Sequence, residues 1–101
     1  MQTNTHIVAD KAVISLQGRF DFSAHREFGN LCGTVLGSKE IRELEIDLGK
    51  VEYLDSSALG MLLLLRERAE NARKRVVLRN CRGTVKQVLD IANFGKLFRI
   101  T

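Results

Sequence analysis

The stretch that decides the fold is Tyr53-Leu54-Asp55-Ser56-Ser57-Ala58-Leu59-Gly60-Met61-Leu62-Leu63-Leu64-Leu65, because it joins a polar Asp-Ser-Ser step to the most apolar run in the chain. Side-chain oxygens of Asp and Ser accept hydrogen bonds from the free N–H groups of a first helical turn, so each of the three is a candidate N-cap. We therefore predict a helix that starts here, directly after a strand-like segment, with the serines exposed at its N-terminus.

A helical wheel divides this predicted helix into two sides. The side expected to face the core carries Ala58, Met61, Leu62, Leu65, Ala69 and Ala72. Leu59, Leu63 and Leu64, together with Gly60, point away from it, so the first two turns are apolar all round. Contiguous exposed apolar surface usually marks an interaction site. Either another part of the fold or a binding partner covers these outer leucines.

Length and composition set the outer bounds. The 101 residues are expected to form a single domain over 1–101, large enough to bury a modest core. No apolar run reaches 18 residues, so no membrane span is expected, and the N-terminal residues lack the pattern of a signal peptide. Cys32 and Cys81 lie far apart without further metal-ligand residues, which indicates free thiols and a cytoplasmic protein.

The net charge of +4 is unevenly distributed. Seven basic residues fall between Arg66 and Arg82, against only Glu67 and Glu70. Such a stripe can attract nucleic acid or anionic lipid. Since no aromatic residue interleaves it and no zinc-finger pattern accompanies it, we favour a solvated helix end and expect no nucleic-acid partner.

Taken in order, the chain predicts alternating strands and helices. Segments 6–8 and 12–17 read as a hairpin, and Ser23 as the N-cap of a helix whose buried residues are Ala24, Phe28, Leu31, Cys32 and Val35 and which Gly37 ends. Segment 41–48 reads as a strand with Leu44, Ile46 and Leu48 on one face and Glu43, Glu45 and Asp47 on the other, followed by a loop at Gly49-Lys50.

Three further elements follow the central helix. Residues 75–80 read as a strand, Thr84 as the cap of a helix with Val85, Val88, Leu89 and Ala92 buried, and residues 97–100 as a last strand. This order predicts an α/β domain whose mixed, mostly parallel sheet begins with an N-terminal hairpin and packs about three helices.

Catalysis is not expected. A nucleophilic Ser56 needs an oriented base, and His25 reads as a surface residue of the first helix. Asp21, Asp47 and Asp55 are oxygen ligands of the kind that Mg²⁺ uses, but solvated or capping roles suit them better. The glycines fit no phosphate-binding loop. We therefore expect no enzyme activity, no cofactor and no metal.

Three motifs carry a family resemblance over nearly the whole chain. Leu16-Gln17-Gly18-Arg19-Phe20-Asp21, then Ile46-Asp47-Leu48, then Asp55-Ser56-Ser57-Ala58-Leu59-Gly60, resemble the STAS domain of bacterial anti-sigma factor antagonists, with Ala58 in place of the usual glycine. The resemblance implies that Ser56 is phosphorylated and that Asp21 lies beside it. It also implies two partners, an anti-sigma factor or related serine kinase and a PP2C-type serine phosphatase.

These implications agree with the physical chemistry of the motif. A phosphate at a helix N-terminus is stabilised by the helix dipole, but the same dianion is costly to bury in an interface. We predict a switch with Ser56 at its centre, Asp21, Asp55 and Ser57 as its neighbours, and Leu59, Gly60 and Leu63 as partner-binding residues. The alternative is a STAS subunit or accessory domain of a transporter or lipid-trafficking complex, in which the leucines make a permanent contact.

Overall fold

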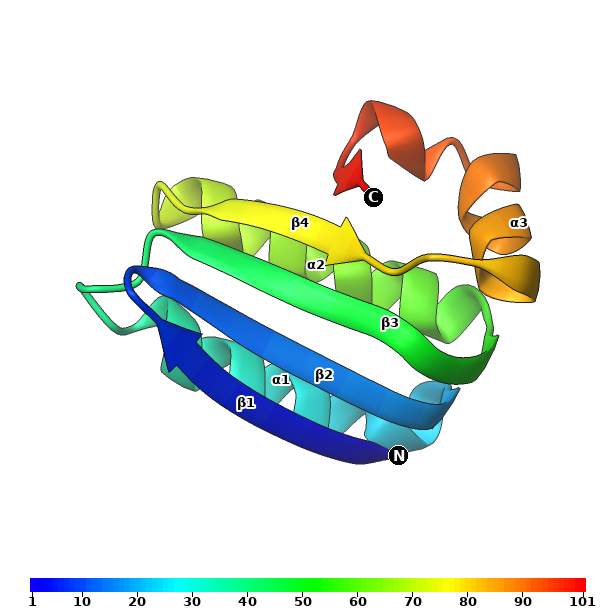
Figure 1. Cartoon of the computed structure of the whole chain (residues 1–101), viewed down its shortest axis with the longest axis horizontal. Helices are drawn as coiled ribbons and strands as arrows, with labels where there is room; N and C mark the ends of the chain where they lie inside the picture. The colour runs from blue at the N-terminus through cyan, green and yellow to red at the C-terminus, as the bar shows by residue number, and fades with distance from the viewer.

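The computed structural model describes residues 1–101 and contains one five-stranded sheet (Figure 1). The strands are β1 (Gln2–Val8), β2 (Lys11–Phe20), β3 (Glu43–Leu54), β4 (Arg75–Arg79) and β5 (Arg99–Ile100), and they lie in this order across the sheet. β1 pairs with β2 antiparallel, and every other neighbouring pair is parallel. The predicted α/β fold with its opening hairpin is confirmed.

Helices cover one face of this sheet and leave the other bare. α1 (His25–Leu36) and α2 (Ser56–Asn71) lie side by side behind the sheet, and α3 (Gly83–Ile91) lies at the end of β4 (Figure 1). Two short 3-10 helices, η1 (Phe22–Ala24) and η2 (Phe94–Lys96), complete the fold. None of these helices is long and apolar enough to cross a membrane.

The core lies between the sheet and α1 and α2, and it follows the predicted alternation. The strands contribute fully buried side chains from their helix-facing positions: Ala12, Ile14, Leu16, Leu44, Ile46, Leu48 and Leu78. α2 contributes Ala58, Met61, Leu62, Leu65 and Ala69, as predicted. Ala72 is instead exposed, because α2 ends at Asn71 and Arg73 turns the chain back toward β4 with a φ of 61°.

The largest departure from the predicted elements is β3, which continues through the expected loop at Gly49-Lys50 to Leu54. Its pairing with β2 survives because the register shifts twice, each time with one extra residue on β3. Gly49 lies at the first of these shifts, in a crowded place: a Cβ there would lie 3.1 Å from Cβ of Asn80 and 3.2 Å from Oδ1 of Asp47. A local glycine pattern looked like a loop, whereas the long-range pairing with β2 keeps the segment in the sheet.

Two predicted caps are also wrong. Ser23 does not cap α1; Asp21 caps η1 by accepting from the Ser23 N–H at 3.0 Å, and α1 begins afterwards without a side-chain cap. Thr84 lies inside α3, which begins at Gly83 with Arg82 at its N-cap. In both places a candidate cap residue sits one or two positions from the observed helix start, where sequence patterns are least decisive.

Several residues of the basic stripe between Arg66 and Arg82 have structural partners. Lys74 donates through Nζ to the carbonyl oxygens of Ser38, at 2.6 Å, and Ile41, while Arg82 donates to the Gly49 carbonyl oxygen at 2.9 Å. Arg66 donates to the Leu97 carbonyl oxygen at 2.8 Å and pairs with Glu70. These contacts hold loops to the sheet and to α2, so Arg66, Lys74 and Arg82 of the predicted stripe have structural roles.

Candidate functional site

The site begins at the junction of β3 and α2. Asp55 is the N-cap of α2, and its Oδ1 accepts from the Ala58 N–H at 3.1 Å. Ser56 is the first helical residue and is exposed, and Ser57 behind it is half-buried. Because Asp55 makes the capping bond, the Ser56 hydroxyl is free to take a modification without uncapping the helix.

Asp21 lies at the same end of the sheet, directly after the neighbouring strand β2. Phe20 pairs with Leu54 in parallel register, so Asp21 and Asp55 each follow one member of a paired set. The Asp21 carboxylate accepts from the N–H and Oγ of Ser23, and these bonds hold the pKa of that carboxyl below its usual value. Asp21 therefore caps η1 with its own oxygens, directly after the end of β2 that pairs with the end of β3. Its place beside Ser56 stays a prediction.

The sequence analysis did not predict a role for two aromatic side chains, Tyr53 and Phe22, near this end of the sheet. The guanidinium carbon of Arg19 lies 4.0 Å from the ring centroid of Tyr53, and Phe22, 69 % exposed, stacks on His25 with ring centroids 5.4 Å apart. His25 is exposed, as predicted. The missed signal was the position of Phe22 directly after Asp21, which places an exposed aromatic ring on η1.

The outward face of α2 continues from Ser56. Gly60 and Leu63 follow it by four and then three residues, which places the three on one side of the helix. Gly60 is exposed, and a Cβ there would meet no atom within 4 Å. Leu63 is 40 % exposed and Leu64 is 50 % exposed, so this face presents a serine, bare backbone and leucine together.

Leu59 departs from its predicted outward orientation. It is half-buried and packs against the core instead of pointing outward with Leu63. A helical wheel, which is drawn for an isolated helix, cannot show this contact because it comes from the rest of the fold. Gly60 and Leu63 remain as the exposed members of the predicted set.

A groove of about 500 Å³ runs between α1 and α2, beside this face. His25 and Arg68 contribute polar groups to it, and Phe28, Met61 and Leu64 contribute apolar ones. Arg68 bridges the two helices by donating to the Gly29 carbonyl oxygen at 3.5 Å. Leu64 therefore lines this groove and is not covered by another part of the fold.

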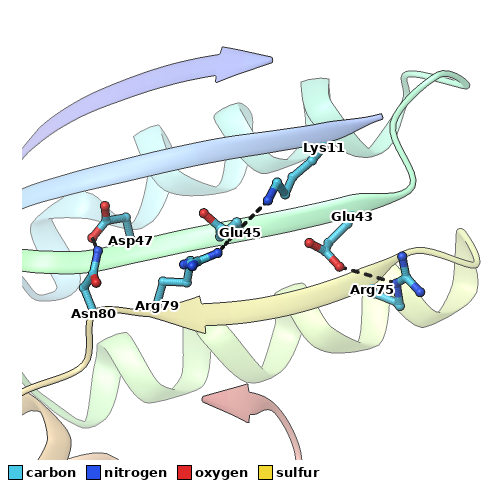
Figure 2. A network of polar contacts seen from close by, with 7 residues as sticks. All are labelled: Lys11, Glu43, Glu45, Asp47, Arg75, Arg79 and Asn80. Atoms are coloured by element: carbon cyan, nitrogen blue, oxygen red, sulfur yellow. Dashed lines mark hydrogen bonds and ion pairs between the residues drawn. The ribbon is translucent and has the colours of Figure 1, made fainter. Parts of the chain in front are cut away.

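The remaining candidate residues have separate structural contacts. Asp47 accepts from the Gly49 N–H at 2.9 Å and from Nδ2 of Asn80 at 3.0 Å, on the bare face of the sheet (Figure 2). Both cysteines are free thiols. Burial raises the pKa of Cys32 to about 12 and that of Cys81 to about 11, so neither is a thiolate at neutral pH.

The class of protein follows from two features: a single α/β domain with this topology, and an Asp-Ser-Ser step at the start of its central helix. Comparison with known proteins identifies that class. The family model described as "Mlab, STAS domain" matches residues 4–99. A STAS-domain containing protein from Pseudomonas aeruginosa (strain UCBPP-PA14) is 46 % identical over 88 residues, which are 87 % of this chain and 85 % of that protein. The chain belongs to the STAS domain family.

Solved structures agree on the fold. The anti-sigma factor antagonist SpoIIAA in its unphosphorylated form matches with a TM-score of 0.78 at 20 % identity, covering 99 % of this chain and 87 % of that one. The phosphorylated form of the Bacillus protein matches with a TM-score of 0.76 at 19 % identity, covering 99 % and 91 %. A sulfate transporter family protein from Wolinella succinogenes matches with a TM-score of 0.79 at 13 % identity, covering 94 % and 79 %.

Proposed function

We propose that this chain is a partner-switching regulator controlled by phosphorylation of Ser56. In its unphosphorylated form it binds an anti-sigma factor or a related serine kinase, and after phosphorylation it releases that partner. A PP2C-type serine phosphatase resets the site. The chain itself performs no catalytic step in this cycle. The observation that carries the proposal is the exposed Ser56 hydroxyl, relieved of capping by Asp55 and in line with Gly60 and Leu63.

The switch works through the interface and leaves the fold intact. A phosphate adds roughly −1.5 to −2 charges, and at the first residue of α2 it gains on the order of 0.3–1 kcal/mol from the helix dipole. When a partner docks on this face, the dianion is buried beside the apolar Leu63 side chain. Burying such a charge unpaired costs several kcal/mol, and ~3–4 kcal/mol lowers affinity several hundred-fold.

A second candidate uses the same face for permanent assembly. This candidate is a STAS subunit or accessory domain of a transporter or lipid-trafficking complex, and the likeness in fold to a sulfate transporter family protein supports it. There Gly60 and Leu63 would contact another subunit continuously. The two candidates differ in one measurable respect, because a permanent contact does not depend on the charge at Ser56.

The deciding experiment compares wild type, Ser56→Asp and Ser56→Ala. Each is used to capture partners from the native host, and the captured protein is then titrated by calorimetry. We expect Ser56→Asp to fold with an unchanged circular dichroism spectrum and to lose its partner, and Ser56→Ala to bind constitutively. Thr84→Asp is the matched control, since it adds the same charge at an exposed position in the first turn of another helix, α3. Equal affinity for Ser56→Asp and wild type would sink the switch and favour the permanent assembly.

A further inference from the structure

The two edges of the sheet differ sharply. One edge is β5, which has two residues and pairs only with Val77 and Leu78 of β4. The other is β1, which has seven residues and pairs with β2 without any shift in register (Figure 1). The outer side of β1 therefore presents a long, uninterrupted row of unpaired backbone groups.

β1 also lacks the features that normally protect an edge strand. Such strands usually carry charged residues, proline or a bulge that prevents another strand from pairing. Charged residues make up 28 % of this chain, yet none of the acidic or basic ones lies within Gln2–Val8, and the chain has no proline. Ile7 and Val8 at the end of β1 are 55 % and 53 % exposed. This edge is open to strand addition.

The hairpin determines which backbone groups are available. Val8 pairs with Lys11 across a two-residue turn, and the residues that flank such a turn form a hydrogen-bonded pair. Alternate residues along an antiparallel strand then turn their N–H and C=O groups to opposite sides. The backbone N–H and C=O groups of Asn4 and His6 therefore face β2, and those of Thr3, Thr5 and Ile7 face outward.

We propose that β1 pairs with β1 of a second copy of this chain, antiparallel and centred on Thr5. An antiparallel pair of identical seven-residue strands overlaps fully only about its middle residue, which places Thr5 opposite Thr5 and Thr3 opposite Ile7 of the second copy. The outward groups of the two strands then form about six hydrogen bonds. The two sheets become one continuous sheet of twice the width.

A second copy is the occupant that fits best because β1 is self-complementary. Threonine pairs are favourable across an antiparallel ladder, and like charges placed opposite one another are not. The chain carries a net charge of +4, so a charged edge would oppose self-association, whereas this edge places no charge against its own image. Ile7 shares the helix-facing side of the sheet with its partner Ala12, so the pairing also covers an exposed apolar side chain.

This contact is separate from the proposed switch. α2 lies behind the sheet beyond α1, and its outward face with Ser56, Gly60 and Leu63 is not part of the β1 edge (Figure 1). Two copies joined through β1 each keep a free α2 face. The Ser56→Asp substitution should therefore leave self-association unchanged, which distinguishes failure of this inference from failure of the proposed function.

The test measures self-association of the whole chain by sedimentation equilibrium over a concentration series. We expect wild type to form a dimer reversibly, and Thr5→Lys and Thr5→Glu each to weaken it at least about tenfold, because each places like charges opposite one another. An equimolar mixture of the two variants should restore the dimer, which a damaged fold would not do. Thr101→Lys, beside the short β5 edge, is the matched control and should dimerise as wild type does.

Hydrogen exchange gives an independent reading without any substitution. Amide protons of Thr3, Thr5 and Ile7 should become protected as the concentration rises, while those of Asn4 and His6 should be protected at every concentration. A chain that stays monomeric throughout, or a dimer that survives both Thr5 substitutions, would overturn the inference. So would protection of Thr3, Thr5 and Ile7 that does not change with concentration.

Discussion

Glu45 and Arg79 form an ion pair of 2.7 Å between Oε1 and Nη1 on the bare face of the sheet (Figure 2). Lys11 of β2 approaches the same oxygen at 3.3 Å, so the central strand is held from both neighbouring strands. Glu45 pairs in register with Val13 and Val77, which are both buried. As a result, Glu45 is only 7 % exposed on a face that no helix covers. This carboxylate is the polar centre of the uncovered side of the fold.

Removing this centre should destabilise the protein measurably. Glu45→Ala loses two charge-assisted hydrogen bonds, but Lys11 and Arg79 are partly exposed and regain water. We expect a loss of roughly 1–2 kcal/mol in the free energy of unfolding, measured by urea melts. Glu43→Ala is the control, since its pair with the exposed Arg75 is longer, at 3.5 Å, and should change stability by no more than about 0.5 kcal/mol. Equal losses in the two variants would contradict the central role of Glu45.

Glu45 should also contribute to acid sensitivity. Burial alone would raise its pKa, but the hydrogen bonds from Arg79 and Lys11 outweigh this and hold the pKa below the ordinary value of 4.5. A carboxyl whose pKa is lower in the folded state stabilises the fold above its unfolded pKa, and that contribution is lost as the pH falls through the folded pKa. We expect the free energy of unfolding to fall below about pH 4.5, and less steeply in Glu45→Gln than in wild type. Parallel acid limbs for the two proteins would rule this out.

Truncating the neighbouring leucines Leu62 and Leu63 of α2 should affect different properties, stability for Leu62 and binding for Leu63. Leu62 is fully buried and Leu63 is 40 % exposed. Leu62→Ala leaves a cavity and should cost roughly 2–5 kcal/mol of stability, whereas Leu63→Ala should stay within about ±0.5 kcal/mol. If Leu63 anchors the partner, its removal should weaken binding by more than ~1–2 kcal/mol, measured by titration. Comparable urea midpoints for the two variants would place Leu63 in the core and remove it from the docking face.

Gly60→Ala should separate stability from binding. Glycine weakens a helix interior, and the added Cβ would meet no atom within 4 Å, so we expect a gain of about 0.5–1 kcal/mol in stability. If a partner approaches the bare backbone of Gly60, the same methyl group should lower its affinity. Gly29→Ala in α1 is the matched control, because its Cβ also meets nothing within 4 Å and it lies on another helix. A Gly60→Ala variant that binds as tightly as Gly29→Ala would show that Gly60 is not a contact.

The elements of the fold were predictable because their signals are local. Alternation in 12–17 and 41–48, and the helical stripe from Ala58 to Ala69, record which side of each element meets the core. The junction of Asp55 and Ser56 was predictable for the same reason, since a cap and its helix are neighbours in the chain. The family resemblance rested on these same local motifs.

The sequence by itself therefore determined the class of fold, the start of α2 and the exposure of Ser56. Only the tertiary structure decided that β3 continues past Gly49, that Leu59 packs inward while Leu63 does not, and that the basic residues after α2 hold loops in place. Each of these depends on a partner distant in the chain: β2 for β3, the core for Leu59, and the Ser38 and Gly49 carbonyl groups for Lys74 and Arg82. Local patterns record the periodicity of one element, whereas burial and pairing are set by whichever remote segment packs against it.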